Sequence, residues 1–269
     1  MTRSSAGAAA AGPAVDPRIR QRRAAVKRRV DRRRLAIVVT IVAVVVLAVA
    51  AVATLHSPLL SVRRVQVVGP HAGTSTAAIV RAAGLGGHPP LVDVDTASVA
   101  ARVEALPFIR TARVTRSWPS TVRIAVTARV PSLVMAVPGG GWAELDRAGR
   151  VLARVPARPA GLALLTVQRA GGTLPPPAVG ASVASSARAG VEVAATLPPA
   201  FSAQVTTVTE LPAQTVDLTL SSGLTVVLGT AADLHAKYVD VASIIAGAPL
   251  HGAKTIDVSV PQSPTVSDT

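Results

Sequence analysis

The stretch that decides the fold is FIRTARVTRSWPSTVRI, residues 108–124, in which two runs of alternating residues flank a short interruption. From Thr121 to Ala128, apolar residues alternate strictly with polar or small ones, and this period of two is typical of a half-buried β-strand. The interruption, residues 117–120, has the composition of a turn. The stretch therefore predicts a β-hairpin whose first strand covers 110–116, with Trp118 packed against the edge of the sheet.

The residues before this hairpin predict one strand and two helices. Residues 62–68, VRRVQVV, have the composition of a strand that stops at a Gly-Pro pair. Residues 74–85 predict a short helix, and Asp95 is placed as the N-cap of a second helix, which ends at Pro107. The order β-α-α-β-β within fewer than 80 residues predicts a small three-stranded sheet covered by two helices.

An apolar segment, Leu35–Leu55, precedes this domain and contains 21 residues without a charge. As a helix it would span about 31 Å, close to the hydrocarbon thickness of a bilayer of about 30 Å. The alternative is a cleaved signal peptide, for which Ala51-Val52-Ala53 resembles a cleavage site. The apolar run is longer than the usual signal segment and follows a 34-residue tail, so the sequence favours an uncleaved membrane anchor.

The flank before the anchor is strongly basic. Residues 1–34 hold eleven basic and two acidic residues, a net charge of +9. Under the positive-inside rule the N-terminus is cytoplasmic, which predicts a single-pass type II protein with its later domains outside the cell. Binding of nucleic acid or of anionic lipid by this tail stays open as an alternative, and a topology signal is the favoured interpretation. The signal is assigned to Arg28, Arg29, Arg32, Arg33 and Arg34.

Few residues in this sequence can carry catalytic chemistry. The chain of 269 residues has no cysteine, which excludes disulfides, thiolate metal sites and a cysteine nucleophile. Its five histidines share no metal-ligand spacing, and neither a Gly-x-Ser-x-Gly elbow nor a phosphate-binding loop occurs. We therefore expect a protein that is not an enzyme, has no small-molecule substrate and needs no cofactor or metal.

The decisive stretch and the residues just after it match a known pattern. They resemble the hallmark segment of the FtsQ/DivIB cell-division family, roughly aromatic-Ile/Val-x-x-Ala-x-Val-x-Arg-x-Trp-Pro-x-Thr-Leu-x-Ile. Ala128 replaces the Glu that is usual in this family, so the partner of that Glu is expected to be rearranged. The β-α-α-β-β order after a membrane anchor resembles a POTRA domain. The motif is carried by Arg116, Trp118, Pro119, Arg129 and Pro131.

The second half of the chain extends the resemblance. Trp142–Leu152 is similar to the hairpin Leu-Ile-Asp-x-x-Gly-x-Val of the family, and residues 216–228 predict another hairpin. Ile256–Pro261 resembles the closing strand, with Ser259 in place of the usual Arg. The implied fold is α+β: a largely disordered cytoplasmic tail (1–34), a transmembrane helix (35–55), a POTRA domain (59–130), a mainly antiparallel β-domain with two helices (131–261) and a C-terminal tail (262–269).

The resemblance implies a bitopic scaffold of the bacterial divisome, located in the cell membrane at the septum. Arg outnumbers Lys 25 to 3 and Asn is absent, which indicates a high-GC bacterium. The implied partners are FtsB/DivIC-like and FtsL-like membrane-anchored coiled coils, other division proteins and the lipid bilayer, but no nucleic acid. Docking is expected by strand addition at the C-terminal edge. The predicted contacts are Ser259, Val260, Gln262, Thr265, Val266, Lys237 and Tyr238.

A second class of function stays open, a membrane-anchored or secreted cell-wall-binding module. It would use the basic domain after the anchor, because residues 59–135 hold nine basic and three acidic residues. A fluorescent fusion separates the two: a band at mid-cell supports division, and a uniform envelope signal supports wall binding.

Overall fold

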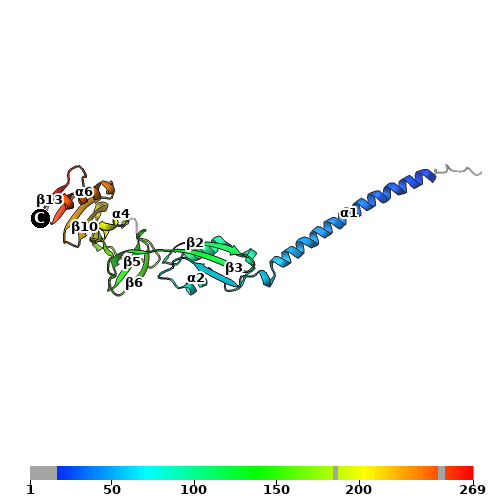
Figure 1. Ribbon diagram of the computed structural model, residues 1–269, viewed down its shortest axis with the longest axis horizontal. Helices are drawn as coiled ribbons and strands as arrows, with labels where there is room; N and C mark the ends of the chain where they lie inside the picture. Colours follow the sequence, from blue (N-terminus) through cyan, green and yellow to red (C-terminus); the bar gives the residue numbers. More distant parts are fainter. Residues whose placement is uncertain (1–16, 184–186, 248–251, 269) are drawn as a thin grey trace, which may run out of the picture. The chain divides into compact units, whose positions relative to one another are not determined.

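The computed structural model describes residues 17–183, 187–247 and 252–268 (Figure 1). The chain forms two units, a helical unit that ends at Ser61 and a folded unit that begins at Val62. The folded unit contains two sheets, one of three strands and one of ten in the described residues. The α+β class expected from the sequence is confirmed.

Helix α1, Pro17–Leu55, is 39 residues long and starts well before the apolar segment. Its part Arg33–Leu55 is long and apolar enough to cross a membrane. The two threonines in this part donate their hydroxyls to the carbonyls four residues earlier, Thr40 to Ala36 O and Thr54 to Ala50 O, so neither hydroxyl needs water.

The prediction of a largely disordered tail over residues 1–34 is wrong for 17–34, which are helical. Ala, Arg, Lys and Gln dominate this segment and are among the best helix formers, and Pro17 occupies the first helical position, where proline is tolerated. Residues 1–16 lie outside the described part of the chain.

The first domain has the expected β-α-α-β-β order. Its sheet runs β1-β3-β2, with β1 parallel to β3 and β2 antiparallel to β3. Helix α2 is visible beside this sheet in Figure 1. The elements are β1 (Arg64–Val68), α2 (Thr76–Ala83), α3 (Thr96–Glu104), β2 (Ile109–Ser117) and β3 (Thr121–Ala128).

Local sequence signals set the ends of these helices. Ser75 Oγ accepts a hydrogen bond from Ala78 N at the start of α2, and Gly84 ends it in the left-handed region with φ of 68°. Asp95 is the N-cap of α3, as predicted, and its Oδ1 accepts from the N–H groups of Ala97 and Ser98. The Ser98 hydroxyl also donates to this carboxylate and, with the backbone bonds, holds the pKa of Asp95 below its ordinary value.

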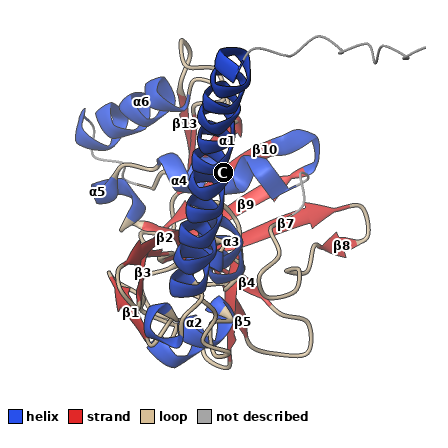
Figure 2. Ribbon diagram, turned by 90° about the vertical axis from the view of Figure 1, so that its right-hand side faces the viewer, coloured by secondary structure: helices blue, strands red, loops and turns tan. Residues whose placement is uncertain are grey.

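The second domain is built on one long sheet, ordered β13-β12-β11-β10-β9-β7-β4-β5-β6, with β8 paired to β7. Most pairs are antiparallel, while β4–β7, β7–β9 and β11–β12 are parallel. Figure 2 shows β7 and β9 side by side. The strands are β4 (Pro131–Ala136), β5 (Trp142–Asp146), β6 (Val151–Val155), β7 (Ala163–Arg169), β8 (Gly172–Thr173), β9 (Val205–Leu211), β10 (Thr215–Leu220), β11 (Thr225–Thr230), β12 (Thr255–Asp257) and β13 (Thr265–Ser267).

The described part of this domain has three α-helices where two were predicted: α4 (Arg188–Thr196), the short α5 (Pro199–Ser202) and α6 (Leu234–Gly247). Helix α4 has no side-chain cap of its own. Instead, Glu210 Oε2 on β9 accepts from Gly190 N in its first turn at 2.7 Å. A capping group supplied by a strand 20 residues away leaves no signal in the local sequence.

Glu210 is fully buried, and Arg169 Nη2 lies 3.2 Å from its other oxygen. Burial raises the pKa of Glu210, and the bond from Gly190 and the charge of Arg169 oppose this shift. Gly190 allows the close approach, because a Cβ there would lie 2.8 Å from Leu165 Cδ1. Glu210 therefore links β9, α4 and β7 inside the domain core.

Candidate partner-binding edge and interdomain junction

Strand β13 forms the C-terminal edge of the long sheet, at the red end of the chain in Figure 1. It pairs antiparallel with β12, with Val266 opposite Ile256. All three of its residues are exposed. Within the described residues no strand pairs with β13 on its other side. The edge thus presents the kind of unpaired strand that an incoming chain can extend.

The register shows which backbone groups of β13 point outward. On either side of β12, Val258 N donates to Val227 O and Lys254 O accepts from Thr225 N, so Ile256 between them faces β11, while Lys254 N donates to Ser267 O at the end of β13. Successive strand residues point their backbone groups to opposite sides, so Thr255 and Asp257 face β13. Their partners Ser267 and Thr265 face back toward β12. The N–H and C=O of Val266 therefore point toward the open side.

The closing strand is shorter than the predicted Ile256–Pro261 and ends at Asp257. Ser259 N donates to Asp257 Oδ1 at 2.8 Å, a local bond that bends the chain out of the strand. The expectation that Ser259 lies on a strand edge is therefore wrong. Val260, 56% exposed, and the exposed Gln262 lie in the connection to β13. Their role as contacts stays a prediction, as it does for Thr265 and Val266.

Lys237 and Tyr238, both predicted as partner contacts, are buried in the structure. Lys237 is 2% exposed, and its Nζ donates to Leu228 O and to Thr230 O at 2.8 Å each. Burial lowers the pKa of Lys237, while the charge of Asp233 partly offsets this effect. A lysine on a helix is normally exposed to solvent. Only the tertiary fold shows that the Lys237 ammonium group donates hydrogen bonds to these two carbonyls.

Tyr238 attaches α6 to α4. Its hydroxyl donates to Val193 O at 3.1 Å and lies 3.1 Å from Thr196 Oγ1. Burial raises the pKa of Tyr238. Lys237 thus fixes α6 to β11 and Tyr238 fixes it to α4, and Val239 on α6 stays exposed.

Two residues of the predicted family motif lie in the first domain with different roles. Arg116 donates from Nε and Nη2 to Val94 O, at 3.2 and 2.8 Å, and so ties β2 to the segment before α3. Trp118, followed by Pro119 in the β2–β3 turn, is 52% exposed. Trp118 is not part of the buried core of this domain, which Val, Ile, Leu and Ala side chains fill without it, and its packing on the sheet edge stays a prediction.

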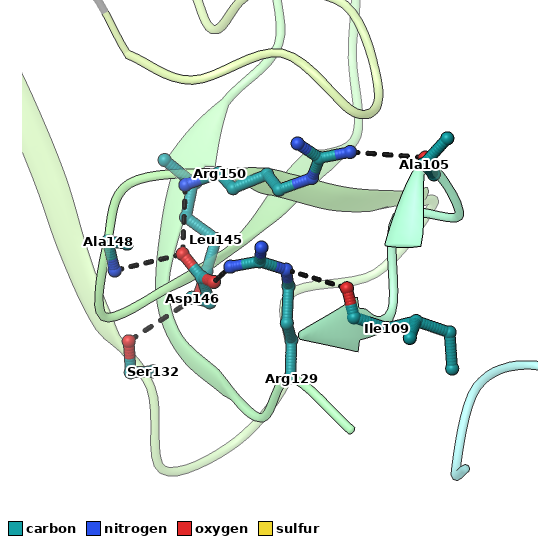
Figure 3. Close-up of polar contacts among 8 residues, drawn as sticks. All are labelled: Ala105, Ile109, Arg129, Ser132, Leu145, Asp146, Ala148 and Arg150. Carbon is teal, nitrogen blue, oxygen red and sulfur yellow. Dashed lines mark hydrogen bonds and ion pairs between the residues drawn. The ribbon is translucent and has the colours of Figure 1, made fainter. Parts of the chain in front are cut away.

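Arg129 joins the two domains at the end of β3 (Figure 3). Its Nε donates to Ile109 O of the first domain at 3.1 Å, and its Nη1 donates to Asp146 Oδ2 of the second domain at 2.6 Å. Only 17% of the Arg129 side chain and 8% of the Asp146 side chain are exposed. Pro131, the next motif residue, opens β4 opposite Asp146. The pair is therefore a largely desolvated ionic link between the domains.

Asp146 also organises the β5–β6 hairpin, as the family pattern implied. Its Oδ1 accepts from Ala148 N and from Arg150 N, both at 2.9 Å, and Gly149 completes the turn with φ of 73°. Arg150 Nη2 in turn donates to Ala105 O at 3.1 Å, which adds a second polar contact between the domains (Figure 3). One carboxylate thus sets both a turn and a domain boundary. The sequence patterns pointed to the Asp146 turn and to Arg129 separately, but they did not show that these two residues are in contact.

Within the described residues, no group of three or more His, Asp or Glu side chains could hold a metal ion.

Comparison with known proteins agrees with this architecture. Residues 60–129 match the family model of the POTRA domain, FtsQ-type, and residues 134–259 match that of Cell division protein FtsQ/DivIB, C-terminal. The chain therefore belongs to the FtsQ family of cell-division proteins, and the resemblance inferred from its motifs is confirmed.

Actinobacterial relatives named Cell division protein FtsQ support this assignment. The chain is 34% identical over 210 residues to that of Mycolicibacterium smegmatis, covering 78% of this chain and 58% of the relative. It is 34% identical over 189 residues to that of Streptomyces collinus, covering 66% and 67%. It is 31% identical over 232 residues to that of Mycobacterium tuberculosis H37Rv, covering 86% and 68%. The chain thus spans 58% of the length of the Mycolicibacterium smegmatis protein.

Proposed function

We propose that this chain is a non-enzymatic, bitopic scaffold of the divisome that docks FtsB/DivIC-like and FtsL-like proteins at the septum. The observation that carries the proposal is the open edge of β13, where the backbone of Val266 points away from the sheet. The N-terminus lies in the cytoplasm and the two domains lie outside, because the arginines precede the apolar span.

Strand addition fits this edge for a physical reason. A partner strand beside β13 gains main-chain hydrogen bonds, which depend little on which side chains the edge carries. This explains how docking survives the replacement of the usual Arg by Ser259. The exposed Val260 and the exposed side chain of Val266, 47% accessible, add apolar area for the partner to cover.

The test is capture of co-expressed FtsB/DivIC-like and FtsL-like proteins by the full-length chain from solubilised membranes. Val266→Pro removes the outward N–H, so capture should weaken by about threefold to tenfold, the worth of roughly one net hydrogen bond. Val266→Ala keeps the N–H and is the matched control, with capture close to that of the wild type. Proline is tolerated at sheet edges, so the domain should still fold.

Equal capture by wild type, Val266→Pro and Val266→Ala, with unchanged thermal melts, would contradict strand addition at β13. Docking would then move to the exposed face of α6 around Val239. A fluorescent fusion tests location separately, since a uniform envelope signal would favour a cell-wall-binding module over a division scaffold.

A further inference from the structure

The turn that carries Trp118 lies beside the start of β1, and the chain before β1 connects directly to α1. Ser120 O accepts from Arg63 N at 2.9 Å and from Arg64 N at 3.2 Å, so this turn is bonded to the start of β1. Trp118 is 52% exposed there, in a chain with only five aromatic residues. A single exposed apolar side chain is common on protein surfaces and implies no function by itself. The position of Trp118 relative to α1 and to nearby arginines is what gives it significance.

The chain between α1 and β1 is short. Residues 56–63 separate Leu55, the end of α1, from Arg64, the start of β1. Eight residues reach at most about 30 Å when fully extended. The covalent chain therefore keeps the Trp118 end of the sheet within reach of any bilayer that α1 crosses.

The open face of the same sheet is basic. Arg64 and Arg123 lie on neighbouring strands, two register positions apart, and Arg113 follows on β2 across from Ala125. All three side chains are exposed, whereas the apolar face of the sheet packs against the domain core. In the described part of the chain, no ion pair links these three arginines to a carboxylate. The guanidinium group of Arg116, in contrast, is bound to Val94 O.

We propose that Trp118 and the arginine face, defined as Arg64, Arg113 and Arg123, contact the anionic lipid headgroups of the membrane that α1 crosses. Indole rings favour the headgroup level, where the apolar ring leaves water while its N–H still finds a partner. Guanidinium groups bind phosphate oxygens through paired hydrogen bonds and are attracted to anionic lipid surfaces. The contact holds the first domain against the bilayer and is separate from partner docking at β13.

The test uses the full-length chain reconstituted in vesicles of phosphatidylglycerol and phosphatidylcholine whose acyl chains carry bromine, which quenches nearby tryptophan. The protein has two tryptophans, so quenching of Trp118 should remove up to about half of the emission. Trp118→Phe leaves only Trp142, in the second domain, and its emission should be nearly unchanged by bromine.

The arginine arm of the test compares two double variants with the same change in net charge. Arg64→Gln with Arg123→Gln should lower the equilibrium constant for contact by about thirtyfold, and high salt should lower it as well. Arg147→Gln with Arg154→Gln changes two exposed arginines of the second domain and should leave the quenching unchanged. Vesicles of phosphatidylcholine alone should give weak quenching with every variant.

A second measurement avoids any change at Trp118. The chain has no cysteine, so Ser117→Cys carries a unique nitroxide, with Ser222→Cys in the β10–β11 turn as the control. The label at 117 should be more accessible to oxygen in the lipid than to aqueous nickel, and the label at 222 should show the reverse.

Equal bromine quenching of wild type and Trp118→Phe, together with a label at 117 that is accessible to nickel, would overturn the proposal. Quenching that is insensitive to salt and to the Arg64 and Arg123 changes would overturn the role of the arginine face. A shift of Trp118 emission by soluble poly(glycerol phosphate) without quenching by brominated lipid would assign the surface to a wall polymer instead.

Discussion

Replacing Asp146 by alanine should destabilise the folded unit by about 3–5 kcal/mol, the usual cost of breaking a buried ion pair by removing one partner. The change leaves the Arg129 guanidinium, 17% exposed as a side chain, without its carboxylate at 2.6 Å. It also removes the acceptor of Ala148 N and Arg150 N in the β5–β6 turn. Asp146→Asn keeps a carbonyl acceptor for the turn and loses only the charge, so we expect about 1.5–3 kcal/mol.

Urea unfolding of the full chain in detergent micelles, followed by tryptophan emission, measures these values, because Trp142 lies on the same strand as Asp146. Arg147→Ala changes an exposed neighbour and should stay within about 0.5 kcal/mol of the wild type. A double-mutant cycle with Arg129→Met should give a coupling energy of about 2 kcal/mol. A cost below about 1 kcal/mol for Asp146→Ala, or a coupling near zero, would refute the assignment of this pair as the link between the domains.

Three further changes test other parts of the fold. Lys237→Met should cost about 1–3 kcal/mol in urea unfolding, because Leu228 O and Thr230 O lose their buried donor, and a neutral result would mean that water replaces it. Asp95→Asn keeps the Oδ1 acceptor of the N-cap but removes the charge and the oxygen that accepts from Ser98 Oγ, so the melting temperature near pH 7 should fall slightly. Because the pKa of Asp95 is lower in the folded protein than its unfolded value of 3.8, the ionised carboxylate stabilises the fold above that pH, and this stability is lost as pH falls through the folded pKa. The variant cannot ionise at this position, so its melting temperature should fall less at acid pH than that of the wild type. An identical dependence of melting on pH in the two proteins would contradict this. Gly190→Ala should lower the melting temperature despite the better helix propensity of alanine, because its Cβ would meet Leu165 Cδ1 at 2.8 Å, and a rise would show that Leu165 moves aside.

The hairpin around Trp118 and the N-cap at Asp95 were predictable, because strand alternation and capping are read from adjacent residues. The position of Lys237 was not, since its carbonyl partners come from β11 and only the packing of α6 brings them together. Helix α4 was not predicted for a similar reason, since the carboxylate that caps it belongs to Glu210 on the later strand β9.

The candidate edge was predicted in its location but not in its details. The sequence placed the docking edge near Val266 but assigned residues 262–269 to a C-terminal tail, whereas the structure forms β13 there as part of the long sheet. It did not show that Asp257 captures Ser259 N, because extended and bent chains fit the same alternating pattern. The sequence did not show that Trp118 stays 52% exposed, because only the structure shows that the small aliphatic residues of the first core pack without it.

The unbroken helix α1 has a mechanical consequence. Its 39 residues rise about 58 Å, roughly twice the hydrocarbon thickness of a bilayer. Residues 17–34 therefore form a stiff arm of about 27 Å that continues the span. A tilt of about 20°, average for membrane helices, displaces the start of this arm sideways by about 9 Å. In a bilayer that Arg33–Leu55 crosses, as we propose, a change in the tilt of α1 is thus converted, without any bending of the chain, into a lateral movement of residues 17–34.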